Sequence, residues 1–290
     1  MFVYVPKNLH LPSPPLVVAI HYCTGTAALY HANTRYADLA EKHGFIVLYP
    51  SSPHQGTWYT FVLNAYVKLL LVANESFVNS WDVSSPATLT HNGGSDSKAI
   101  ADMILYSKTH FNTGSVFITG TSSGGMMTQV LAATYPALIT ACSAFCGVPF
   151  GGFSSSGIAQ WSDACATGKI IKSSEEWAAI VYDAHPGYVG PRPRMQVWHG
   201  TDDEIIDYGN FGESVKQWRR VLGVEGVEVG RREDDPSRQW TRTVYGEMVE
   251  GLSGKGVVHN IPLEEDDVIR FFGLANLRPN QDNANIFVKG

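Results

Sequence analysis

Residues 115–136 read SVFITGTSSGGMMTQVLAATYP, and this stretch decides the fold. It opens on an apolar run typical of a buried strand and closes on a helical segment that Pro136 ends. Between them lies GTSSG (120–124), which matches the G-x-S-x-G turn that holds a serine in a strained conformation with its hydroxyl exposed. The motif alone is a weak signal, but the flanking strand and helix predict that Ser122 is a nucleophile. The alternative is a Gly/Ser-rich turn without chemistry.

The alternation of strand and helix patterns extends through most of the chain. Continuous apolar runs typical of buried strands occur at residues 15–22, 45–50, 138–147 and 194–200. Apolar residues at helical spacing occur at residues 33–43, 95–111 and 208–222. Strands that alternate with helices predict an α/β fold, in which a mostly parallel sheet is covered by helices on both faces.

Some local features refine this outline. Ser95 is predicted as a helix N-cap. Residues 223–240 are polar and charged and are expected to form a surface excursion. Residues 275–290 are expected to be a loose C-terminal tail. No clear domain boundary interrupts the rest, so residues 1–274 are predicted to form a single catalytic domain.

Composition narrows the classes of partner. The net charge of −6 and the pI near 5.9 argue against a nucleic-acid or anionic-membrane surface. The four cysteines are Cys23, Cys142, Cys146 and Cys165, and the sequence does not choose among their possible pairings. No His/Cys cluster has the spacing of a zinc site. We expect no metal, no cofactor, no nucleic-acid or membrane partner, and a monomer.

A serine nucleophile needs a base, and the base needs an orienting acid. The loop TDDE (201–204) follows a strand and offers Asp203 as the acid, although spacing alone does not exclude Asp202. His259 lies in a later loop, GKGVVHNIP (254–262), and completes the chain order Ser, Asp, His.

Three other histidines are less well placed for the base. His21 ends a strand, His91 lies in a polar loop and His199 lies beside the acid.

The oxyanion of an ester hydrolase needs two backbone donors. The N–H of Ser123 begins the helix after the nucleophile, where the helix dipole favours negative charge. The second donor is expected in HYCTGTA (21–27), which follows an early strand, at the N–H of Cys23 or Thr24. An ordinary strand-end turn is about as probable from position alone.

The segments AIHYCTGTA, WDVSSPATLTHNGGSDS, VFITGTSSGGMM, HGTDDE and GVVHNIP resemble those of fungal acetylxylan esterases of carbohydrate esterase family one. These are related to feruloyl esterases and polyhydroxybutyrate depolymerases. The resemblance covers residues 2–274 and implies a secreted α/β-hydrolase-fold enzyme that deacetylates xylan or xylo-oligosaccharides. It places the triad at Ser122, Asp203 and His259 and the oxyanion-loop cysteine at Cys23. Trp161 lies where an aromatic side chain could contact the sugar, or could equally serve packing.

Other functions remain open from the sequence. A feruloyl esterase or a polyester depolymerase would use the same triad with a different acyl pocket. The chain could also be a catalytically inactive product of a faulty gene model.

The sequence departs from the family pattern at the start and at its cysteines. The chain opens on a strand pattern without signal-peptide features, which by itself fits a cytosolic protein or a missing N-terminus. With the resemblance, we expect a secreted protein whose signal peptide is missing from this chain. The family usually has a cysteine where Ser80 precedes Trp81, and that cysteine looks like the disulfide partner of position 23. A second family cysteine is replaced by Gly152, which leaves Cys146 as the alternative partner of Cys165.

Residues 58–80 are the least expected part of the chain. They are apolar, lack Gly and Pro, and stand where the family has one cysteine. Suppose that an intron beginning with GT and ending with AG interrupts the cysteine codon and is not removed. The first part of the codon, read with the start of the intron, would then encode Trp58, and the last part, read with the end of the intron, would encode Ser80. We therefore interpret residues 58–80 as a translated intron or another non-native insert. A membrane span is disfavoured because the apolar run is shorter than the about 20 residues that a span needs, and a substrate lid would not explain the single-cysteine replacement.

Overall fold

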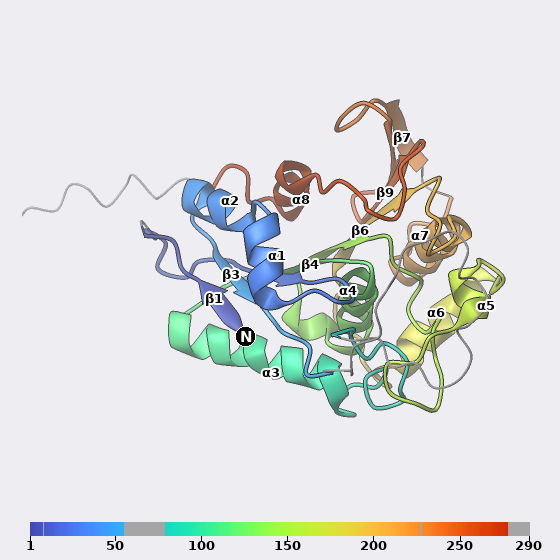
Figure 1. Ribbon diagram of the computed structural model, residues 1–290, viewed down its shortest axis with the longest axis horizontal. Coiled ribbons are helices and arrows are strands. Elements are labelled where there is room, and N and C mark those ends of the chain that lie inside the picture. The colour runs from blue at the N-terminus through green and yellow to red at the C-terminus, as the bar shows by residue number, and fades with distance from the viewer. Residues whose placement is uncertain (8, 55–78, 227, 278–290) are drawn as a thin grey trace, which may run out of the picture.

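The computed structural model describes residues 1–277 except residues 8, 55–78 and 227 (Figure 1). Almost all of the suspected insert at 58–80, and residues 278–290 of the expected tail, therefore lie outside the described residues. At the described end of the chain, Ala275 and Leu277 pack against the hydrophobic core.

A nine-stranded sheet forms the centre of the described structure, in the order β1-β3-β2-β4-β5-β6-β9-β8-β7. Its strands are β1 (Phe2–Tyr4), β2 (Leu16–Ile20), β3 (Ile46–Tyr49), β4 (Val116–Thr121), β5 (Ala141–Phe145), β6 (Arg194–Gly200), β7 (Glu228–Glu233), β8 (Trp240–Tyr245) and β9 (Val249–Gly254). The six central strands from β3 to β9 are parallel to one another, whereas β1, β8 and β7 pair antiparallel at the two edges.

Helices cover both faces of this sheet. They are α1 (Ala27–Asn33), α2 (Tyr36–His43), α3 (Ser95–Phe111), α4 (Ser123–Thr134), α5 (Asp163–Ala166), α6 (Ser174–Asp183), α7 (Gly209–Val221) and α8 (Glu265–Phe272). Side chains of α3, α4, α6 and α7 pack in one core cluster with Leu16, Val18 and Ile20 of β2, and those of α1, α2 and α8 pack in a second cluster with Val17 and Ala19. Figure 1 shows α2 and α8 side by side in the layer that forms the second cluster.

The strand β2 shows why the sequence folds this way. All five of its residues are buried, because alternate side chains enter opposite clusters and leave no face for water. The predicted α/β fold with a mostly parallel, doubly covered sheet is therefore confirmed. Among the helices of the described ranges, none combines the length and the apolar composition needed to span a bilayer.

Three local predictions differ from the structure. The helix expected at 33–43 is α2 and begins only at Tyr36, because Thr34 has extended backbone and Asn33 ends the separate helix α1. The surface excursion expected at 223–240 contains the exposed edge strand β7. Ser95 is not an N-cap: Gly94 occupies that position, and the Ser95 hydroxyl instead donates a 2.5 Å hydrogen bond to the buried Asp82 carboxylate.

The turn between β4 and α4 lies against the end of β2. A Cβ atom at Gly124 would overlap the carbonyl oxygen of Ile20 and lie 2.6 Å from that of His21. Because these contacts are backbone atoms, which cannot rotate away as a side chain can, position 124 admits only glycine. Ser122 itself has φ 57° and ψ −118°, a strained conformation that places it at the apex of the turn.

We predict that Gly124→Ala lowers the free energy of unfolding by about 3 kcal/mol or more, because the added methyl group must push α4 away from the end of β2. Gly212→Ala is the matched control. Gly212 lies in α7 with open space around its Cα, so the change should raise stability by about 0.5–1 kcal/mol through helix propensity. Urea denaturation of both variants measures the effect, and equal stability of the two variants would contradict the close contact.

Candidate active site

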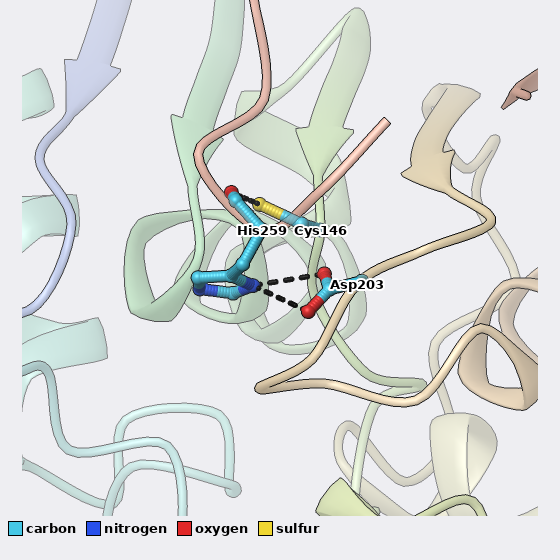
Figure 2. Close-up of side chains that lie close together, drawn as sticks. All are labelled: Cys146, Asp203 and His259. Carbon is cyan, nitrogen blue, oxygen red and sulfur yellow. Dashed lines mark hydrogen bonds and ion pairs between the residues drawn. The ribbon is translucent and has the colours of Figure 1, made fainter. Parts of the chain in front are cut away.

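Three side chains from distant parts of the chain form one hydrogen-bonded series. The hydroxyl oxygen of Ser122 lies 2.9 Å from Nε2 of His259. On the other side of the imidazole, Nδ1 lies 2.9 Å and 2.8 Å from the two carboxylate oxygens of Asp203 (Figure 2). This is the geometry in which an imidazole can take a proton from the serine while the carboxylate orients the ring.

Parallel strands bring these residues to one edge of the sheet. Ser122 directly follows β4, Asp203 follows β6 and His259 follows β9. Because parallel strands end on the same side, the loops that follow them meet there, although the residues are far apart in sequence. Topology, and not local sequence, therefore assembles this cluster.

Asp203 is held by more than His259. Its side chain is fully buried and accepts hydrogen bonds from the backbone N–H groups of Ile205 and Ile206. Burial alone would raise the pKa of the Asp203 carboxyl, but hydrogen bonds from His199 and His259, the charge of His259 and the Ile206 N–H hold it well below its usual range. The carboxylate is therefore ionised at neutral pH, as an orienting acid must be.

His199 is the second histidine on this carboxylate. Its Nε2 lies 3.2 Å from Asp203 and 2.9 Å from the carbonyl oxygen of Ile206, so Nε2 carries a proton that both oxygens share. The sequence places His199 beside the acid, but nothing in its spacing reveals that its side chain turns toward the carboxylate.

Asp202 points elsewhere. It is exposed, and its carboxylate accepts a hydrogen bond from the neighbouring Thr201 hydroxyl. Of the two carboxylates that spacing leaves open, only Asp203 meets the imidazole.

The two candidate oxyanion donors lie on either side of a close backbone contact. Tyr22 to Gly25 form a turn closed by a hydrogen bond from Gly25 N–H to Tyr22 C=O, with Thr24 at φ 68°. Ser123 is the first residue of α4, where a backbone N–H has no preceding helical carbonyl to bind. The contact of Gly124 with the backbone of Ile20 and His21 brings these two segments together.

Cys146 lies beside His259. Its thiol contacts the backbone carbonyl oxygen of His259 at 3.7 Å, as Figure 2 shows. Burial raises the pKa of this thiol far above its usual range, so the sulfur keeps its proton and donates a hydrogen bond to the carbonyl.

Cys146, Asp203 and His259 are residue types that can bind a metal ion, and their candidate ligand atoms lie within 4.8 Å of one another. However, the imidazole Nδ1 is already bound to both carboxylate oxygens, so the arrangement favours hydrogen bonding over ion binding.

None of the four cysteines, all of which lie in the described part of the chain, is in a disulfide, so the expected disulfides are not formed. Cys165 contacts the side-chain oxygen of Asn210 at 3.4 Å, whereas Cys146 contacts His259, so these two do not pair. Burial raises the pKa of the Cys23 thiol, while hydrogen bonds with the Ser80 side chain and the Thr24 backbone lower it in part. Position 80, where the resemblance expects a cysteine, therefore lies in contact with Cys23.

Trp161 lies in the loop before α5 and is partly exposed, at 36% of its surface. Its indole N–H donates to the Asp163 carboxylate at 2.8 Å, and its ring packs edge-on against Phe153. One part of the ring thus serves packing, and another part faces solvent.

Comparison with known proteins identifies relatives along nearly the whole chain. The chain is 43% identical over 281 residues to acetylxylan esterase A of Aspergillus oryzae and to the probable acetylxylan esterase A of Aspergillus flavus, covering 95% of this chain and 84% of each relative. The chain belongs to the acetylxylan esterase family. It is a carboxylic ester hydrolase, although no protein-family model matches it.

Solved structures agree with this membership. An acetyl xylan esterase from Aspergillus awamori is 40% identical and superposes with a TM-score of 0.84, covering 94% of this chain and 93% of that one. Esterase PE8, at 14% identity and a TM-score of 0.50, shares the fold alone. The α/β-hydrolase fold implied by the resemblance is confirmed.

The depressed pKa of Asp203 predicts a pH effect on stability. A carboxyl whose folded pKa lies below its unfolded value of about 3.9 stabilises the fold fully above that value and loses this contribution as pH falls below it. The free energy of unfolding of the wild type should therefore fall more steeply between pH 5 and 2 than that of Asp203→Asn. The exposed Asp202→Asn should keep the wild-type slope. Urea titrations across this pH range test the difference, and parallel curves for wild type and Asp203→Asn would contradict it.

Proposed function

We propose that this enzyme removes acetyl groups from acetylated xylan or xylo-oligosaccharides, with Ser122, His259 and Asp203 as a catalytic triad. The proposal rests on one observation above all: the Ser122 hydroxyl, at the apex of a strained turn, is 2.9 Å from an imidazole whose other nitrogen is bound to a buried carboxylate. The names of its relatives supply the substrate class. The Ser–Asp–His order along the chain is that of α/β hydrolases.

In this mechanism His259 acts first as a base. Nε2 takes the hydroxyl proton of Ser122 while the Ser122 oxygen attacks the acetyl carbonyl carbon. The tetrahedral intermediate collapses when the same proton passes from Nε2 to the departing sugar oxygen, which leaves an acetyl group on Ser122. Water then enters, gives a proton to His259 and releases acetate, after which the proton returns to the serine.

Asp203 and the oxyanion donors stabilise charge in this sequence. The ionised carboxylate faces the imidazolium that forms at His259, and two backbone N–H groups hold it from the other side. The backbone N–H groups of Ser123 and Cys23 bind the oxyanion, where the N-terminus of α4 adds favourable partial charge. Trp161 offers its exposed ring surface to a sugar unit. We infer that the enzyme is secreted, because its proposed substrate is an extracellular polysaccharide, and we propose that it acts as a monomer.

Ser122→Ala should lower acetate release from acetylated xylan by about 10⁴-fold or more, because no other group takes over the acyl transfer. Ser154→Ala, at an exposed serine in another loop, is the matched control and should keep wild-type activity. A fluorophosphonate probe should label the wild type and Ser154→Ala but not Ser122→Ala. Labelling that persists in Ser122→Ala would overturn the nucleophile assignment.

The same assay decides among substrates. Feruloylated xylan and a soluble polyester, offered beside acetylated xylan, test the related esterases. A wild type that is labelled by the probe but releases ferulate faster than acetate would be a feruloyl esterase, and one that is neither labelled nor active would be an inactive chain.

We further propose that residues 58–80 replace a single cysteine and are not part of the native enzyme. Support comes from the contact between Ser80 and Cys23, since a cysteine at the position of Ser80 would have its thiol partner already beside it. The disulfide would join the segment before Trp81 to the oxyanion loop.

A chain in which one cysteine replaces residues 58–80 should form this disulfide in an oxidising secretory host and gain about 2–4 kcal/mol of stability. This variant has one cysteine more than the four of the present chain, and two of the five form the disulfide. Three thiols should therefore remain titratable. The matched control carries one serine in place of residues 58–80 and should keep four free thiols and the lower stability. Five free thiols in the cysteine variant, or a transcript that retains the whole insert, would contradict the proposal.

A further inference from the structure

We propose that His21 is a positioning residue for the oxyanion loop, and that the segment Trp81–Asp82 holds His21 in place. This inference rests on the proposed function, because it assigns a role to the loop that carries the Cys23 N–H. Among the described residues, no hydrogen bond joins the proposed triad to His21, Trp81 or Asp82, and the proposed mechanism assigns no role to the segment WDVSS.

The hydrogen bonds of His21 define its tautomer. The backbone N–H of Ser52 donates to Nε2 at 3.2 Å, so Nε2 is an acceptor and carries no proton. The proton therefore lies on Nδ1, which is 2.8 Å from the carbonyl oxygen of Tyr22 and donates to it. Burial lowers the pKa of this imidazole, in agreement with a neutral ring.

This hydrogen bond orients the peptide that carries the proposed donor. The Tyr22 carbonyl is fixed by two donors, Nδ1 of His21 and the N–H of Gly25. In a trans peptide the N–H points opposite to the C=O, so fixing the Tyr22 carbonyl also fixes the direction of the Cys23 N–H. Gly25 packs closely here, since a Cβ atom would lie 2.9 Å from the Tyr22 carbonyl oxygen and 3.2 Å from Nδ1 of His21.

Trp81 fixes His21 from two directions. Its ring packs on the imidazole with centroids 4.8 Å apart, and its indole N–H donates to the backbone carbonyl of His21 at 2.8 Å. That carbonyl is one of the two, with that of Ile20, that Gly124 approaches closely. One residue thus contacts the imidazole and also the backbone on which the nucleophile turn rests.

Asp82 anchors this segment to the fold. Its fully buried carboxylate accepts hydrogen bonds from the backbone N–H groups of Ser85 and Ala159 and from the hydroxyl of Ser95. Its own N–H donates to Asp96 in the first turn of α3 at 2.7 Å. A rigid path therefore runs from α3 through Asp82, Trp81 and His21 to the oxyanion loop.

Replacement of His21 separates this role from general stability. With 4-nitrophenyl acetate, His21→Ala should lower kcat about 10- to 100-fold with KM within twofold, because a displaced oxyanion donor weakens transition-state binding more than substrate binding. His21→Asn can restore the donor to the Tyr22 carbonyl and should recover most of kcat. His21→Gln can restore only the acceptor for Ser52 and should stay near His21→Ala.

His91→Ala is the matched control. His91 also makes a hydrogen bond from Nδ1 to a backbone carbonyl, that of Thr134 at 2.7 Å, and also packs on an aromatic ring, that of Tyr135. Its loss should lower the melting temperature while kcat stays within twofold of the wild type.

The possible outcomes are distinct. A folded His21→Ala with wild-type kcat would overturn the inference. A loss of kcat that follows the fall in melting temperature across all three His21 variants would also overturn it, because it would show a general structural effect. If His21→Ala does not fold, the contrast between the Asn and Gln variants decides. A wild type without esterase activity would contradict the proposed function itself, before any variant is compared.

Discussion

The structure depends on the contact between two backbones at the centre of the sheet. The turn that carries Ser122 approaches the end of β2 so closely that Gly124 admits no side chain. This contact places the start of α4 beside the loop that follows His21, so Ser122 and the proposed oxyanion donors are held by the same contact. The turn follows β4, which pairs directly with β2, so the sheet holds the two contacting backbone segments in place.

The second constraint is electrostatic. Asp203 is a buried carboxylate, and a buried charge is tolerated only when it is paired and hydrogen-bonded. Two imidazoles and two backbone N–H groups meet this need. The same contacts that make the burial of Asp203 possible also hold His259 at the distance from Ser122 that proton transfer needs. The stability of the fold and the proposed chemistry thus depend on the same hydrogen bonds.

Much of this architecture could be predicted from the sequence, and the exceptions have physical reasons. Buried parallel strands such as β2 were recognisable because they are apolar on both faces, and the turn at Ser122 because its glycines are required by close packing. The strand β7 was missed because all six of its residues are exposed and carry no apolar signal, so that only its pairing with β8 makes it a strand. The N-cap prediction for Ser95 was wrong because its hydroxyl donates a hydrogen bond to the carboxylate of Asp82, which lies in the preceding loop, and not to the end of the helix.

The sequence by itself determined the class of fold, the family and the residues that could act, because strand and helix periodicity and the turn motif are local properties. The tertiary structure decided which of these residues meet. It brought Asp203, and not Asp202, to the imidazole, turned His199 onto the same carboxylate, and left Cys23 beside Ser80. The direction of a side chain at the end of a strand depends on what packs around it, and that surrounding is assembled from segments that the sequence keeps far apart.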